Sequence, residues 1–230
     1  MNAHIVYSAR QSLIAAVLIA LLGVTSFFAF EPQVGRAITD DFIVTQQITD
    51  EISFLVAAAD VSMVSSIAGV TGGSATGTTM IVVRSNDSLG YNMTLHFSSS
   101  TAMNQNGGTS YINNYTPTVV GTPDWTWVNN STGQPAEFGY SVSASSALNV
   151  ATKFRDNGTS ACNTGSSNTT FRCWMNPSTT PETIINRTSA TGNGGATTTL
   201  IFHVAVPNAP TPALSSGTYT ATGTLTATNN

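Results

Sequence analysis

The pattern of apolar and polar residues divides the chain into two parts. From Leu13 to Phe30 the sequence is apolar and uncharged. Beyond Ala37 it changes to short alternating segments separated by Gly, Pro and Asn. In residues 91–98, Tyr, Met, Leu and Phe alternate with Asn, Thr, His and Ser, which is the period-two pattern of a half-buried antiparallel strand. The pattern therefore predicts an N-terminal hydrophobic helix followed by β structure.

Similar patterns predict further strands in the second part. Residues 79–84 are apolar and β-branched, and turn-forming residues 85–90 separate them from the strand at 91–98, so we expect a hairpin. The remaining predicted strands are Phe42–Thr49, Glu51–Val56, Ala136–Ser143, Thr183–Asn186, Thr197–Val206 and Tyr219–Thr228.

Three other segments complete the predicted fold. Residues 147–154 have apolar positions at helical spacing, which predicts a short helix between two sheets. The Gly-rich residues 68–79 and 188–197 are expected to be loops. Alternation gives each strand one apolar face, so the strands should form two packed sheets. The predicted fold class is all-β, an antiparallel two-sheet immunoglobulin-like sandwich with one short helix, as a single domain over residues 38–230.

The N-terminal apolar run predicts export. As a helix rising about 1.5 Å per residue, it would extend about 27 Å, close to the thickness of a bilayer's hydrocarbon core. With Arg10 before it, the segment 1–37 is either a signal peptide cleaved after Ala37 or an N-terminal membrane anchor. A third interpretation, a type IV pilin leader, requires an acidic residue inside the run, whereas Glu31 follows it. Cleavage and anchoring both place residues 38–230 outside the cytoplasm, secreted or at the cell surface.

Charged residues are scarce in this chain. They make up only 8% of it, against about 25% in typical domains. Hydrophobic residues make up 41%, enough to bury a core, so we expect a folded chain. The net charge is −4 and the basic residues are scattered, which argues against nucleic acid as a partner. An acidic membrane surface is also a poor partner, so we expect membrane contact only through the N-terminal segment.

The two cysteines of the chain, Cys162 and Cys173, predict a disulfide. An exported protein meets an oxidising environment, and closing a loop of this size contributes about 3 kcal/mol in the chain-entropy model. A metal or thiol-redox site would need further ligands or a Cys-x-x-Cys spacing, and the sequence has neither. Trp174 follows Cys173, where its ring is expected to pack on the bridge.

Four aromatic residues are candidate ligand contacts. Trp125 and Trp127 flank Thr126, so in an extended backbone both rings would point to the same side as a sugar-stacking platform. The alternative is that they fill the core, as aromatic side chains commonly do. Tyr111 and Tyr115 lie in a polar segment, where exposed rings would suit contact with a ligand, unless the segment folds over a sheet edge.

The sequence gives little support for catalysis. His96 and His203 fall on predicted strands without an identifiable acid or nucleophile, and no nucleophile elbow, zinc-binding helix or nucleotide-binding loop is present. Glycoside hydrolysis needs two carboxylates about 5 to 9 Å apart, and Asp124 and Glu137 are isolated candidates for such a pair. The acidic residues between 40 and 60 lack the spacing of a calcium loop. We therefore expect no catalytic residues, metal or cofactor.

Several segments resemble a group of exported bacterial proteins. They are Ala59–Met63, Ile67–Thr79, Asn86–Thr94 and Pro210–Thr222. In these segments the chain looks like uncharacterised exported β-sandwich surface proteins of bacterial candidate phyla, and it is distantly similar to WxL-type cell-surface proteins. The resemblance implies a β-sandwich and a surface location. It transfers no functional residue, because the Trp-Thr-Trp of residues 125–127 departs from the Trp-x-Leu pattern.

Together these features predict a non-enzymatic secreted or cell-surface structural protein of the bacterial envelope. Its expected partners are other copies of itself or other envelope components, joined through exposed strand edges. The first alternative is an adhesin or carbohydrate-binding module that binds glycans through Trp125, Trp127, Tyr111 or Tyr115. The second alternative is a secreted enzyme acting on glycans or peptides.

Overall fold

The computed structural model of the chain describes residues 3–29, 39–128 and 131–230, with side chains in the helix described for residues 11–25. It divides into two units, Met1–Gln47 and Ile48–Asn230. The first unit contains helix α1 (Ala3–Ala29), whose large apolar side chains from Leu13 to Val24 are exposed. The predicted helix is therefore present.

The segment 1–37 was predicted to be a cleaved signal peptide or an N-terminal membrane anchor. Within the residues that the structure describes, no helix combines the length and the apolar character needed to cross a membrane. The predicted cleavage position after Ala37 lies outside the described residues.

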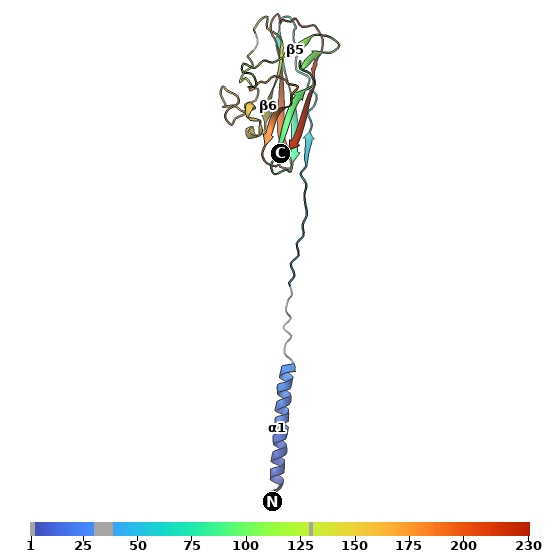
Figure 1. Cartoon of the computed structure of the whole chain (residues 1–230), viewed down its shortest axis with the longest axis vertical. Helices are drawn as coiled ribbons and strands as arrows, with labels where there is room; N and C mark the ends of the chain where they lie inside the picture. The colour runs from blue at the N-terminus through green and yellow to red at the C-terminus, as the bar shows by residue number, and fades with distance from the viewer. Residues whose placement is uncertain (1–2, 30–38, 129–130) are drawn as a thin grey trace. The chain divides into compact units, whose positions relative to one another are not determined.

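All described strands belong to the second unit, and the larger of its two sheets is mixed (Figure 1). Its strand order is β1-β2-β8-β6-β5-β4-β9. The bounds are Ile52–Val56 (β1), Gly73–Ser85 (β2), Ala196–Val206 (β8), Glu137–Ala144 (β6), Tyr111–Asn114 (β5), Met103–Gln105 (β4) and Tyr219–Ala221 (β9). Neighbours are antiparallel except β5 and β6, which run parallel.

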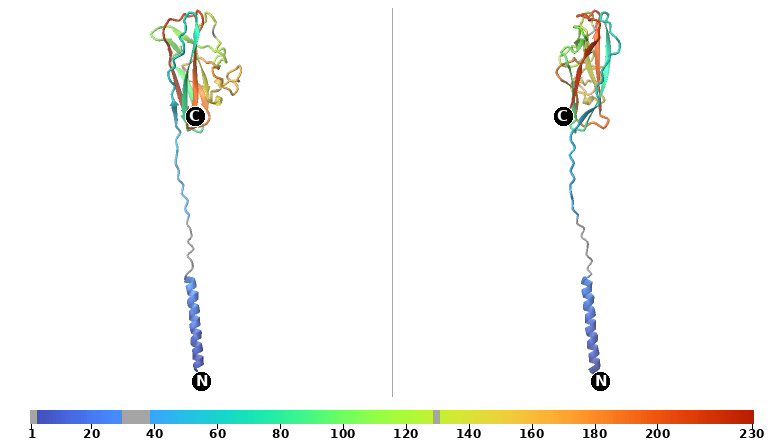
Figure 2. Two further views of the ribbon diagram at one scale, coloured as in Figure 1. Left: turned by 180° about the vertical axis from the view of Figure 1, so that it is seen from behind. Right: turned by 90° about the vertical axis from the view of Figure 1, so that its right-hand side faces the viewer.

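The smaller sheet is antiparallel, with the order β10-β3-β7. Its strands are β10 (Gly223–Asn229), β3 (Tyr91–Phe97) and β7 (Glu182–Arg187). The predicted alternation of β3 is confirmed, because every second residue from Tyr91 is buried and the residues between are only partly buried. Figure 2 gives two further views of the ribbon, in which both sheets can be followed by colour.

One hydrophobic core lies between the two sheets. The small sheet contributes Met93, Leu95 and Phe97, and the large sheet contributes alternate residues of β2, β6 and β8. The Phe97 ring contacts Phe138 edge-on, with ring centroids 5.8 Å apart, and also approaches Tyr140 at 6.0 Å. Fully burying one such large apolar side chain stabilises a fold by about 1.5 to 3 kcal/mol. The predicted β-rich, two-sheet fold is confirmed at this level of detail.

Some predicted boundaries and pairings are wrong. Residues 79–84 and 91–97 do not form a hairpin, because β2 and β3 belong to different sheets. Asp87 lies in the connection between these two strands. Its backbone N–H donates to Ser85 Oγ, and its carboxylate accepts from the Leu89 N–H at 2.8 Å. The connector therefore forms a compact turn that carries the chain from one sheet to the other.

Other segments also differ from their predicted structure. Phe42–Thr49 forms no strand, and the predicted loop at 68–79 becomes strand from Gly73 onward. The predicted strand Tyr219–Thr228 is interrupted at Thr222, so its first part joins the large sheet as β9 and its second part joins the small sheet as β10. Strands β4 and β5 were not predicted, because they are short and polar.

The predicted helix at 147–154 is instead two 3₁₀ turns, Ala147–Asn149 and Thr152–Phe154. Between them the Ala151 N–H donates to the Ile184 carbonyl of β7 at 2.9 Å. The segment begins directly after β6 of the large sheet and pairs with β7 of the small one. It therefore connects the sheets as predicted, but with tighter turns than an α-helix.

Candidate functional site

Four ring-bearing side chains form a second cluster on the outer face of the large sheet. This outer cluster consists of Tyr115, Trp127, Trp174 and His203. The Trp127 ring lies 4.1 Å from Tyr115, 4.6 Å from His203 and 5.6 Å from Trp174 between ring centroids. Contacts at these distances add stability beyond the area they bury. Of the four candidate ligand contacts, the structure brings together only Tyr115 and Trp127.

The outer cluster fits on the sheet because β6 carries a glycine there. Gly139 pairs with His203 across the β6–β8 ladder. A Cβ at Gly139 would lie 2.9 Å from the Tyr115 Cβ and 3.0 Å from the Trp127 ring. Glycine therefore makes room for the two aromatic rings.

Asp124 fixes Tyr115 from the side of the loop. Its Oδ2 accepts hydrogen bonds from the Tyr115 hydroxyl at 2.7 Å and from the Thr118 N–H at 2.8 Å. Burial of Tyr115, reinforced by the hydrogen bond to Asp124 and by its negative charge, raises the pKa of the tyrosine hydroxyl. Tyr115 therefore remains a neutral donor. The two hydrogen bonds join Asp124 to residues 115 and 118 and so hold this loop in place.

His203 completes the outer cluster from strand β8. Its Nδ1 lies 3.0 Å from Thr76 Oγ1 on the neighbouring strand β2. Burial lowers the pKa of His203 below its ordinary value of 6.5, because the charged imidazolium loses solvation there. A neutral histidine packed between Trp127 and Trp174 is consistent with a structural contact.

Trp125 and Trp127 do not form one platform. Trp125 packs against the main core, with the Arg172 guanidinium 5.2 Å above its ring, whereas Trp127 belongs to the outer cluster. Trp174 packs in the outer cluster, whereas Cys173, which has a φ of 60°, belongs to the main core.

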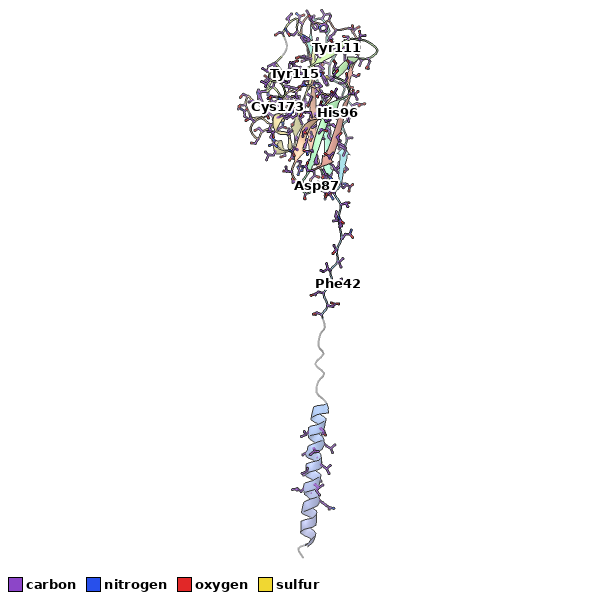
Figure 3. The ribbon with its side chains drawn as sticks, viewed as in Figure 1. Phe42, Asp87, His96, Tyr111, Tyr115 and Cys173 are labelled. Carbon is purple, nitrogen blue, oxygen red and sulfur yellow. A yellow bond between two sulfur atoms is a disulfide. The ribbon has the colours of Figure 1, made fainter. Side chains whose placement is uncertain are left out.

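Tyr111 lies apart from the outer cluster, on β5. Tyr111 is 40% exposed, whereas Tyr115 is buried. Figure 3 labels both residues. Near β5 is an open, polar pocket with a volume of about 500 Å³. It is lined by Ser100, Thr101, Asn113, Asn114, Thr116, Pro135, Glu137 and Thr211. The pocket offers amide, hydroxyl and carboxylate groups, which are the groups that hydrogen-bond to sugars and other polar ligands.

The predicted disulfide between Cys162 and Cys173 is present. The loop that it closes is organised by Asp156, whose carboxylate is fully buried. Asp156 Oδ2 accepts from the Thr169 N–H at 2.6 Å, and Oδ1 accepts from the Gly158 N–H at 2.7 Å and the Thr169 hydroxyl at 3.2 Å. The bridge and the carboxylate thus fix the same loop.

Sequence reasoning missed the structural roles of His203 and Asp156 and the place of Trp174 in the outer cluster. The one available signal was the position of His203 on the polar side of an alternating strand. Among the residues that the structure describes, no group of three or more His, Cys, Asp or Glu side chains is arranged to hold a metal ion. Asp124 accepts a hydrogen bond from the Tyr115 hydroxyl, whereas Glu137 lines the polar pocket.

Comparisons of this chain with protein-family models, with curated proteins and with solved structures found no match.

Proposed function

We propose that this chain is an exported, non-enzymatic structural protein of the cell surface that assembles through the edges of its sheets. The observation that carries the proposal is the absence of charged residues from β1, β9 and β10, which lie at sheet edges. Soluble proteins commonly protect such edges with charged residues or proline. An edge without this protection favours pairing with another chain.

Strand β7 forms the remaining sheet edge, and it differs from the other three edge strands because it carries charged residues. Strand β7 begins and ends with charged residues, Glu182 and Arg187, and Glu182 forms an ion pair with Lys153 at 2.5 Å. Its backbone is also partly covered, since Val150 pairs with Ile185. Charged residues are therefore present on this edge strand and absent from the other three. We further infer that the two sheets form an immunoglobulin-like sandwich, a class in which surface and adhesion domains are common.

Export and assembly are tested together in the source cells. Intact cells are treated with a protease that cannot enter them, and with a chemical cross-linker, before the protein is detected by immunoblotting. The proposal expects loss of the domain to the protease and cross-linked species containing this chain. Recovery of an untouched cytosolic protein with free thiols at Cys162 and Cys173 would refute it.

A second candidate function is glycan binding at the polar pocket. The observation in its favour is the position of Tyr111, which precedes the pocket residue Asn113 on the same face of β5. An exposed ring beside amide and carboxylate groups is a common arrangement for binding sugars. We expect Tyr111→Ala to abolish any signal on a glycan array, whereas Phe171→Ala, which removes another exposed ring, should not. Equal binding by both variants would exclude this site.

A further inference from the structure

The segment before β1 exposes an unusual amount of apolar surface. Residues 39–51 have no regular secondary structure. Within them the side chains of Phe42, Ile43, Val44 and Ile48 are between 81% and 92% exposed, and Figure 3 shows Phe42 on this backbone. In an extended chain Phe42, Val44 and Ile48 share one face, as strand residues do. A contiguous apolar surface of this kind generally marks an interaction site.

The chain cannot readily cover this segment with its own β1, because Asn86 fixes the backbone between them. Asn86 Oδ1 accepts from the Glu51 N–H at 2.6 Å, and its Nδ2 donates to the Thr49 carbonyl at 3.1 Å. The Asn86 N–H also donates to the Glu51 carbonyl at 3.2 Å. Residues 49–51 form no turn and lack freedom to reverse. A reversal before them would fall within the apolar residues themselves, which favours a partner strand from another molecule.

Strand β10 offers the best edge for such a partner. It pairs only with β3, and it contains threonine at alternate positions and no charged residue. Strand β1 is interrupted by a bulge between Phe54 and Val56, and β9 has only three residues. Strand β7 is partly covered, as described above. Strand β10 is as long as the segment 42–48 and keeps a continuous register with β3.

Apolar side chains on β10 and on the neighbouring β1 remain partly exposed. Phe54 of the adjacent β1 pairs with the buried Val83, yet its side chain is 41% exposed. Leu225 and Ala227 lie opposite buried residues of β3 but are themselves only partly buried. Strands β1 and β10 are neighbours, and we call the line where they meet, with these three residues on the two strands, the seam. One further strand with an apolar face would cover them.

We propose that residues 42–48 of one copy add as a strand to β10 of a second copy and insert Phe42, Val44 and Ile48 into this seam. The occupant is a second copy of this chain, because its own segment carries Phe42, Val44 and Ile48 on one face, has the length of β10 and contains no charged residue. Main-chain hydrogen bonds to β10 hold the added strand, and the apolar face selects its orientation. This inference rests on the proposed self-assembly and names its contact.

The test compares two full-length variants in a mild detergent, Val44→Asp and Ile43→Asp. Both place a carboxylate on the same exposed segment, but only Val44 lies on the inserted face. We expect Val44→Asp to weaken association by about 100-fold in light scattering, since an apolar side chain of this size loses its burial and a charge replaces it. Ile43→Asp should associate as the unaltered chain does. Any association through α1 is common to both variants.

Hydrogen exchange identifies the acceptor edge in the same samples. We expect assembly to protect the amides of residues 223–229, and Val44→Asp, but not Ile43→Asp, to remove this protection. Equal behaviour of the two variants, or protection at β9 or β7 in place of β10, would refute the inference. If that result came with surface-exposed, cross-linked protein in cells, only this contact would be refuted. A cytosolic, uncross-linked protein would refute the proposed function itself.

Discussion

Replacing Asp156 by asparagine should destabilise the domain substantially, although the side chain hardly changes in size. The carboxylate is fully buried and accepts three hydrogen bonds, from the Gly158 N–H and from the N–H and hydroxyl of Thr169. An amide retains one acceptor oxygen and turns an NH₂ group toward at least one donor. Hydrogen bonds to a charged group are worth about 1.5 to 3 kcal/mol, and an unsatisfied buried donor costs about 1 to 3 kcal/mol. We therefore expect Asp156→Asn to lower the free energy of unfolding by about 2 to 4 kcal/mol.

The measurement is urea unfolding at neutral pH with the disulfide intact, followed by fluorescence and circular dichroism. Asp87→Asn is the matched control, because Asp87 is also buried but its carboxylate accepts only the Leu89 N–H. Asparagine can keep that bond, so the control should lose less than about 1 kcal/mol. If both variants lost the same amount, or if Asp156→Asn lost less than the control, the carboxylate would not organise the loop.

Three further predictions concern stability. Replacing Cys162 and Cys173 by serine should lower the free energy of unfolding by about 3 kcal/mol in urea titrations, and a loss below about 1 kcal/mol would contradict the loop-closure estimate. The lowered pKa of His203 means that the unfolded state binds a proton at higher pH than the folded state does. The free energy of unfolding should therefore fall as the pH decreases through about 6.5. His203→Gln should reduce this fall when urea midpoints are compared at pH 7.5 and 5.5. An unchanged pH dependence in this variant would refute the prediction. Gly139→Ala should lower the free energy of unfolding by about 1 to 3 kcal/mol and alter near-ultraviolet circular dichroism, because its Cβ would meet neighbouring atoms at 2.9 Å. The control Gly192→Ala should be neutral, because a Cβ there would have no atom within 4 Å.

The parts of the fold that the sequence predicted are those whose cause is local. Strand β3 has an uninterrupted alternation of apolar and polar residues, and burial of one face follows directly from that period. The disulfide followed from the number of cysteines and the expected compartment. Strands β6, β7 and β8 were placed within one or two residues of their ends, because each contains β-branched or aromatic residues between turn formers.

The candidate site was harder to predict because its residues meet only through tertiary structure. Tyr115 and Trp127 lie in the connection between β5 and β6, His203 lies far along the chain on β8, and their contact depends on the lack of a side chain at Gly139. Nothing local to residues 125–127 indicates that the first Trp faces the main core and the second packs in the outer cluster. The backbone between them is not a regular strand, so the period-two rule does not apply to it.

The segment 42–48 shows where a correct local pattern gives a wrong structure for a single chain. Its apolar and β-branched residues predicted a strand, yet a strand forms only where another strand supplies hydrogen-bond partners. In the described residues, 39–51 pair with no strand, and Asn86 hydrogen-bonds to Thr49 and Glu51 at the end of this segment. The proposed addition of residues 42–48 to β10 of a second copy would supply the missing hydrogen-bond partner.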